Sequence, residues 1–294
     1  MNSKTISIKE LIESGNPPEI LFWVGCAGSY DERYKKVTKS FVKILNELNI
    51  NYGVLGKEEG CTGDPARRAG NEYLFQMQAI NNINLLNTYN VKKIVTACPH
   101  CFNTIKNEYP ALGGEYEVQH HSEFLEELIN DGKIQIKKSK EKITYHDSCY
   151  LGRANNIYSA PRKVIESLKG DLIEMKRNKQ NGLCCGAGGA QMFKEAEKGK
   201  KSINIERIEE AVDSGATTIA SACPFCLTMM SDGIKEKNQE ENIKTKDIVE
   251  ILVENIKSKK QDESTNIFTR IANENFYGIG RALVRELAAR FKCI

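Results

Sequence analysis

Short runs of apolar, often β-branched residues alternate along this chain with longer stretches in which apolar residues recur every three or four positions. This alternation predicts β-strands followed by amphipathic helices, an arrangement typical of βαβ units with a mainly parallel sheet. In the helix predicted for 34–48, for example, Val37, Phe41 and Ile44 share one face. The predicted strands are 20–24, 93–96, 142–145 and 217–220, and the predicted helices are 34–48, 65–89, 162–168 and 194–214.

The cysteines repeat along the chain with nearly constant spacing. Cys26 and Cys61 recur 123 residues later as Cys149 and Cys184, and Cys98 and Cys101 recur 125 residues later as Cys223 and Cys226. Such a long internal repeat indicates a tandem duplication. We therefore predict an α/β protein of two tandem, duplicated, Rossmann-like halves. The expected parts are an N-terminal extension at 1–19, a first cysteine-rich domain at 20–135, a second at 136–257, and a linker and tail at 258–294.

The tail has no counterpart in the repeat, and the sequence leaves open whether it is a docking helix or a disordered appendage. Cys293 lies in it, outside both cysteine sets, and we expect it to be a bystander. The two sets also differ from each other at one position. Cys184 is followed by Cys185, whereas Cys61 is followed by Thr62, so the second half offers five thiols and the first offers four.

The cysteines are expected at the carboxyl ends of the predicted strands. Cys26 and Cys149 come just after strands, and so do the two CPxC pairs. In open α/β sheets ligands bind outside the carboxyl ends of the strands, so three segments of each half can converge there. A helix that opens at each CPxC would also direct its N-terminal dipole toward the site and favour thiolate over thiol.

Charge and composition exclude several classes of protein. The 294 residues include 42 basic and 39 acidic side chains, mostly interspersed, so no basic tract indicates nucleic acid or an anionic membrane as partner. The sequence shows no apolar run long enough to span a bilayer and no secretory signal pattern, so we expect a cytoplasmic protein without direct membrane insertion. In a reducing compartment, clustered cysteines more often bind metal than form disulfides.

Three kinds of chemistry compete for each cysteine set: disulfides, structural zinc and an iron-sulfur cluster. Zinc is saturated by four thiolates, usually supplied as two close pairs. Here each half has one close pair and two ligands far from it, and the second half has a fifth thiol. An iron-sulfur cluster accepts thiolates from widely separated segments. Glycines beside the cysteines, as in GAGG at 186–189, would let the backbone approach a bulky cofactor, although such a run is also typical of a turn or a nucleotide loop.

These motifs resemble the twin cysteine-rich (CCG) domains of heterodisulfide reductase subunits B and D and of iron-sulfur subunits associated with electron-transfer flavoprotein, glycolate and lactate oxidoreductases. The similarity runs from about Ile20 to Ile256 and includes YHDSCYLGR, GLCCGAGG and GCTGDPARRAGNEYLFQ. The resemblance implies a non-cubane [4Fe-4S] cluster on the five-cysteine set, which is Cys149, Cys184, Cys185, Cys223 and Cys226. The first set departs from the pattern at Thr62, so a conventional [4Fe-4S] cluster is expected on Cys26, Cys61, Cys98 and Cys101.

The resemblance further implies an electron-transfer subunit of a cytoplasmic oxidoreductase, working in a hetero-oligomeric complex with a flavoprotein or ferredoxin-type partner. Longer family members carry ferredoxin-like modules that this sequence does not show, so we expect electrons to enter from another subunit. Two alternatives remain: a catalytic disulfide reductase of the heterodisulfide type that uses the second cluster, and a zinc-stabilised interaction module.

Several charged side chains near the cysteines are further candidates. Each has a functional interpretation, as a cation that stabilises an anionic cluster, a ligand or a proton carrier, and a structural one, as a surface charge, a packed side chain or a helix cap. For the histidines the packing role is favoured. These residues are Arg67, Arg68 and Arg153, His100 and His146, and Asp64 and Asp147.

Overall fold

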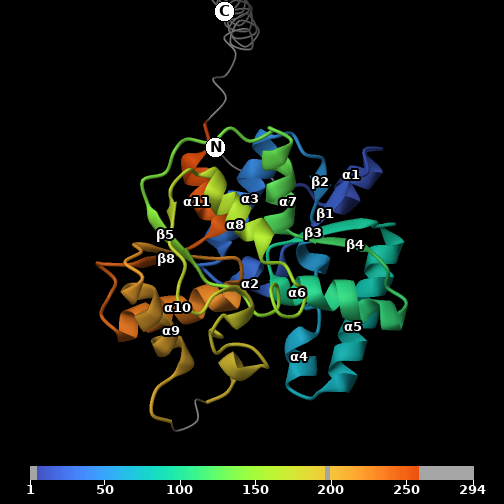
Figure 1. Cartoon of the computed structure of the whole chain (residues 1–294). Helices are drawn as coiled ribbons and strands as arrows, with labels where there is room; N and C mark the ends of the chain where they lie inside the picture. Colours follow the sequence, from blue (N-terminus) through green and yellow to red (C-terminus); the bar gives the residue numbers. More distant parts are fainter. Residues whose placement is uncertain (1–4, 196–198, 258–294) are drawn as a thin grey trace, which may run out of the picture. The chain divides into compact units, whose positions relative to one another are not determined.

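The computed structural model describes residues 5–195 and 199–257, so the predicted tail at 258–294 lies outside the described residues (Figure 1). The chain is mixed α/β with two parallel four-stranded sheets, as expected for duplicated halves. Strand order is β2-β1-β3-β4 in the first sheet and β6-β5-β7-β8 in the second. The strands are β1 Ile20–Trp23, β2 Tyr52–Gly53, β3 Lys93–Thr96, β4 Glu117–His120, β5 Lys142–Tyr145, β6 Asp171–Leu172, β7 Thr218–Ser221 and β8 Lys244–Asp247.

The helices pack their apolar faces on these sheets. In α3, Val37, Phe41 and Ile44 are all buried, as the sequence pattern predicts. Helices α7 and α11 each follow an outer strand and begin with a capping box, His120 with Glu123 in α7 and Asp247 with Glu250 in α11. The helices are α1 Ile8–Glu13, α2 Gly25–Tyr30, α3 Lys35–Glu47, α4 Asp64–Arg68, α5 Glu72–Thr88, α6 Pro99–Asn103, α7 His121–Asn130, α8 Ser159–Ser167, α9 Ile203–Asp213, α10 Pro224–Glu236 and α11 Ile248–Asn255.

Two predicted helices are wrong in their extent. The helix expected at 65–89 is broken into α4 and α5, because Gly70 adopts a left-handed φ of 87° and the Asn71 side chain caps the new N-terminus. The helix expected at 194–214 begins only at Ile203, after a polar, lysine-rich stretch that has no apolar face to bury. The short outer strands are missing from the prediction, since a segment such as KTKD in β8 carries no hydrophobic run.

A hydrophobic core is shared by the two halves, and α3, α7, α8 and α11 surround it (Figure 1). Polar contacts reinforce this junction. Arg33 donates two hydrogen bonds to the carboxylate of Glu250, at 2.7 and 2.8 Å. The fully buried His121 and Asp247 join through Nε2 and Oδ1, 2.9 Å apart. The two halves therefore pack as one unit, which fixes the position of each cysteine set relative to the other.

Within the described residues, every helix is too short or too polar to cross a bilayer.

Candidate metal centre

The first cysteine set gathers at the carboxyl ends of β1 and β3. Cys26 lies in the first turn of α2, Cys61 lies in the loop before α4, and Cys98 and Cys101 lie at the start of α6. All four line one pocket together with Trp23, Thr62 and His100. Cys98 and Cys101 are buried, whereas Cys26 is exposed. The structure thus brings together four thiols that are separated by up to 75 residues in the sequence, with one of them at the surface.

The second cysteine set occupies the matching place in the second half. Cys149 follows β5, Cys184 and Cys185 lie in the loop after β6, and Cys223 and Cys226 lie at the start of α10. The Sγ atoms of Cys185 and Cys226 are 3.4 Å apart. Cys149 and Cys184 are also within hydrogen-bonding reach of each other. Five thiols therefore form one connected group.

Glycines shape the loop that carries the middle cysteine of each set. Gly63 and Gly186 have left-handed φ angles of 92° and 95°, which favour glycine. This conformation directs the Gly63 N–H to Cys61 Sγ at 3.5 Å and the Gly186 N–H to Cys184 Sγ at 3.3 Å. A backbone donor to sulfur favours the thiolate, so each glycine prepares its cysteine to bind a metal.

The position that distinguishes the two sets has the same geometry in both halves. Thr62 Oγ1 lies 3.9 Å from Cys101 Sγ, just as Cys185 Sγ lies 3.4 Å from Cys226 Sγ. Thr62 is buried, with 2% of its surface exposed, and Cys185 is buried to a similar degree. The first half therefore has a hydroxyl where the second half has its fifth thiol.

His100 joins the two sets. Its Nδ1 lies 2.9 Å from Asp64 Oδ2, its ring stacks on Tyr150 with centroids 4.1 Å apart, and Phe225 contacts its edge. It also bonds to the thiol of Cys223, which belongs to the second set. Burial acts to lower the pKa of His100, but the bonds to Asp64 and Cys223 outweigh burial and raise this pKa well above its ordinary value.

The thiols share protons within each set. Hydrogen bonding from Cys61 lowers the pKa of Cys26 to about 6, and the same contact raises the pKa of Cys61. In the second set, bonds from Cys149 and Cys185 hold the pKa of Cys184 far below that of a free thiol, while both partners are raised. Like charges at this spacing resist joint ionisation. Loading a metal would therefore release protons, and a cation would hold all the thiolates together.

The arginines proposed from sequence are engaged by other groups. Arg67 pairs with Glu108 at 2.8 Å, and Arg68 pairs with Asp64 at 3.0 Å and also with Glu108. Arg153 donates to the carbonyl of Gly182, in the loop that leads to Cys184. Their partners in the described part of the chain are thus oxygen atoms, and these side chains act through the loops that carry the cysteines.

Sequence reasoning missed a buried arginine that supports the second set. Arg162 of α8 grips both oxygens of Asp147, at 2.7 and 2.9 Å, and both oxygens of Glu174, at 2.6 and 3.0 Å. Asp147 also accepts from the Lys179 N–H at 2.7 Å. Asp147 lies two residues before Cys149, so this network fixes the loop that presents the cysteine. No pattern near Arg162 in the sequence signals this role.

Glu59 is a second residue that sequence reasoning missed. Its carboxylate accepts hydrogen bonds from the backbone N–H groups of Val24 and Gly25, at 3.0 and 2.6 Å, and so ties the loop before Cys61 to the turn that carries Cys26. Burial raises the pKa of Glu59 to about 7, against the pull of these two donors. The acidic side chain thus holds the first site together in a pH-dependent manner.

We expect Glu59→Gln to change how the stability of the metal-free protein depends on pH. Because the folded-state pKa is raised above the ordinary 4.5, the folded state gains from the proton at low pH and loses that gain as pH rises through about 7. The wild-type free energy of unfolding should therefore fall by up to about 3 kcal/mol between pH 5 and pH 8 relative to the variant. Urea unfolding across this range measures the difference, with the exposed neighbour Glu58→Gln as control. Parallel wild-type and variant curves would contradict the expectation.

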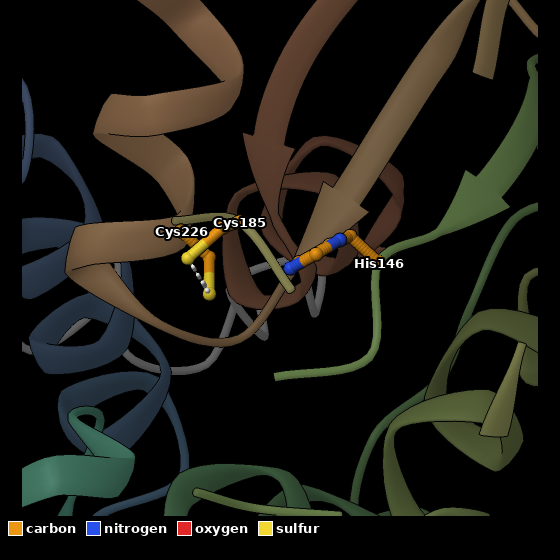
Figure 2. Close-up of side chains that lie close together, drawn as sticks. All are labelled: His146, Cys185 and Cys226. Atoms are coloured by element: carbon orange, nitrogen blue, oxygen red, sulfur yellow. Dashed lines mark hydrogen bonds between the residues drawn. The ribbon is translucent and has the colours of Figure 1, made fainter. Parts of the chain in front are cut away.

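The donor sets fit a sulfur-rich cofactor. Each half presents thiols from three separate segments, with sulfur atoms in contact. Each half also has a buried ring nitrogen without a hydrogen-bond partner in the described residues, Trp23 Nε1 in the first and His146 Nε2 in the second. His146, Cys185 and Cys226 place one donor atom each within 4.8 Å of one another (Figure 2). A cluster with bridging sulfides would supply acceptors for such nitrogen atoms.

Comparison with known proteins agrees with the duplication. The cysteine-rich domain (CCG) family matches at residues 20–106 and again at 143–231. The probable iron-sulfur-binding oxidoreductase FadF of Bacillus subtilis is 46% identical over 252 residues, covering 85% of this chain and 36% of that protein. The EtfAB:quinone oxidoreductase of Syntrophomonas wolfei is 45% identical over 82% of this chain and 35% of its own length.

A third relative belongs to the dihydromethanophenazine:CoB–CoM heterodisulfide reductase of Methanosarcina barkeri. This polypeptide is 34% identical over 80% of this chain and 58% of its own length. The chain thus spans little more than a third of the first two relatives. The family match, in contrast, covers most of both halves, including eight of the nine cysteines of the two sets by their repeated spacing and the ninth, Cys185, within the second. The chain belongs to the family of proteins with cysteine-rich (CCG) domains.

Proposed function

We propose that the chain is an iron-sulfur electron-transfer subunit of an oxidoreductase and that it holds two clusters. A conventional [4Fe-4S] cluster would be bound by Cys26, Cys61, Cys98 and Cys101. A non-cubane [4Fe-4S] cluster would be bound by Cys149, Cys184, Cys185, Cys223 and Cys226. The observation that carries the proposal is the gathering of all nine thiols into two equivalent groups at the carboxyl ends of duplicated parallel sheets.

Such clusters supply one-electron redox chemistry at potentials set by their surroundings. The residues of the chain would hold and connect them. His100 supports transfer between the two sites, because it follows Cys98 directly through Pro99 and also contacts Cys223. Exposed Cys26 supports the first site as the one that a partner reaches, whereas Cys223 and Cys226 are buried. The first half would then relay electrons and the second would receive them.

A flavoprotein or ferredoxin-type subunit is the proposed redox partner, in a hetero-oligomeric complex in the cytoplasm. The name of the Syntrophomonas wolfei relative, EtfAB:quinone oxidoreductase, supports a flavoprotein of the electron-transfer type. The even balance of charge argues against nucleic acid as partner.

Metal analysis after anaerobic purification of the full chain tests the proposal. We expect a brown protein with about eight irons and about eight sulfides, since each of two clusters carries four of each. Electron paramagnetic resonance (EPR) of the reduced protein should show two distinct centres. A colourless protein that contains only zinc would contradict the proposal and would support a zinc-stabilised interaction module instead.

A second candidate function is reduction of a disulfide at the second cluster. It is favoured by the fifth thiol of that set and by the likeness to the Methanosarcina barkeri heterodisulfide reductase. An anaerobic assay with a reduced dye and small or thiol-linked disulfides distinguishes the two functions. Turnover that is lost in Cys185→Ser would favour the reductase. Reduction of both clusters without turnover of any disulfide would favour the carrier.

Exchanging the residues that distinguish the two sets should exchange their spectra. Thr62 and Cys185 occupy equivalent buried positions beside Cys101 and Cys226. We expect Cys185→Thr to convert the EPR signal of the second centre to the kind shown by the first, and Thr62→Cys to alter only the first. Iron content should change little in either variant. Identical spectra for the wild type and both variants would contradict the unequal assignment of the clusters.

A further inference from the structure

The residue three positions before the first cysteine of each half carries a buried ring nitrogen. Trp23 precedes Cys26, and His146 precedes Cys149, so the two occupy the same place in the repeat. Neither side chain is exposed to solvent. Trp23 Nε1 and His146 Nε2 have no hydrogen-bond partner in the part of the chain that the structure describes. Because buried polar atoms are nearly always paired, two unpaired atoms at equivalent positions indicate a missing common partner.

Both atoms belong to the cysteine sites. Trp23 lines the pocket formed by the first set. A donor nitrogen of His146 lies within 4.8 Å of the sulfur atoms of Cys185 and Cys226. Figure 2 shows the outer ring nitrogen of His146 turned toward these two sulfur atoms. The histidine therefore faces the second site either as a ligand, through a lone pair, or as a donor, through an N–H group.

Arg207 decides between these two roles. Its Nε donates to His146 Nδ1 at 3.0 Å. A guanidinium carries only donors, so Nδ1 must supply the lone pair and cannot carry the proton of a neutral imidazole. Arg207 is fully buried and is held in place by the carbonyl of Arg177 at 2.8 Å and by Glu210 at 3.0 Å. The proton of the neutral ring is thereby placed on Nε2, the nitrogen that faces the thiols.

We propose that His146 and Trp23 are equivalent N–H donors to the sulfur atoms of the second and first clusters, and that Arg207 is the positioning residue that fixes the His146 tautomer. The proposal rests on the proposed function, because it takes cluster or cysteine sulfur as the acceptor. Tryptophan supports the donor role, since its indole N–H can donate but cannot ligate. Hydrogen bonds to sulfur stabilise the more negative, reduced state, so both residues raise the reduction potential of the neighbouring cluster.

The first test reads the tautomer directly in the metal-free full chain. The protein has four histidines, so ¹⁵N-histidine labelling gives a small set of ring signals, and His146→Gln identifies those of residue 146. We expect protonated Nε2 and unprotonated Nδ1 for His146. A proton on Nδ1 would overturn the role of Arg207 and would leave Nε2 free to ligate a metal.

The second test measures reduction potentials and iron content in the loaded full chain. We expect His146→Leu to retain the wild-type iron content but to shift the potential of the second cluster, and of that cluster alone, to a more negative value. His146→Gln keeps an N–H group and should restore part of the shift. Trp23→Phe should lower the potential of the first cluster only. Lys237→Gln removes an exposed positive charge at the end of α10 and should leave both potentials unchanged.

The outcomes separate this proposal from the proposed function. Loss of about half the iron in His146→Leu would show that His146 is a ligand and would overturn the donor role, while leaving the two-cluster assignment in place. Unchanged potentials in His146→Leu and Trp23→Phe would also overturn it. A wild-type protein without iron or sulfide would overturn the proposed function and the donor role together.

Discussion

Replacing Cys149 with alanine is expected to remove one cluster and to halve the iron, from about eight to about four atoms per chain. Cys149 is in hydrogen-bonding contact with Cys184 and interacts electrostatically with Cys185 and Cys223, so its thiolate is part of the connected second group. The residue is partly exposed, and its truncation should therefore leave the packing of the domain intact. The remaining iron should belong to the first set, which shares no cysteine with the second.

Iron and sulfide analysis with EPR checks this expectation. Cys26→Ala should have the reciprocal effect and abolish the signal of the first centre, because Cys26 lines the first pocket and is likewise accessible. Cys293→Ser, in the sequence outside both sets, is the matched control and should retain all the iron. Full iron content in both alanine variants would show that the two sets are not two cluster sites.

Replacing Arg162 with leucine is expected to lower the free energy of unfolding by about 3–5 kcal/mol, the usual cost of removing one partner of a buried ion pair. The side chains of Arg162 and Asp147 are only 6% and 5% exposed, and four hydrogen bonds tie the guanidinium to Asp147 and Glu174. Without Arg162, the Asp147 carboxylate would stay buried and would keep its bond from the Lys179 N–H at 2.7 Å, with no cation to balance its charge. The loop that presents Cys149 should loosen as a result.

Denaturant unfolding of the metal-free protein measures the loss. Lys163→Ala changes the adjacent residue of α8, whose ion pair with Glu126 is partly solvent-exposed, and should leave the stability nearly unchanged. Combining Arg162→Leu with Asp147→Leu should recover part of the loss, because the uncompensated charge is then gone. Wild-type stability in Arg162→Leu alone would contradict a structural role for this network.

Much of the fold is predictable because its signals are local in the chain. The central strands β1, β3, β5 and β7 are buried apolar runs and lie at or within one residue of their predicted positions. The helix α3 follows from one apolar face at helical spacing. The outer strands β4 and β8 are not predictable in this way, because polar segments such as KTKD become strands only when a neighbour offers a free edge.

The break between α4 and α5 also escaped the prediction. A glycine and an asparagine are tolerated inside a helix pattern, and only the packing of Gly63 against Phe75 shows why the chain must turn there. A Cβ atom at Gly63 would lie 2.8 Å from the Phe75 ring. Close approaches of this kind depend on residues that meet through the fold, so periodicity cannot reveal them.

The sequence alone determined the duplication, the membership of the two cysteine sets and the single difference between Thr62 and Cys185, because the spacing along the chain repeats and can be compared directly between the halves. The tertiary structure decided which groups surround the thiols. The contact of His100 with Cys223 and the bond from Arg207 to His146 each join segments more than 60 residues apart. Protonation, tautomer and hydrogen bonding depend on distance and burial, and these are fixed only when both halves pack around their shared core.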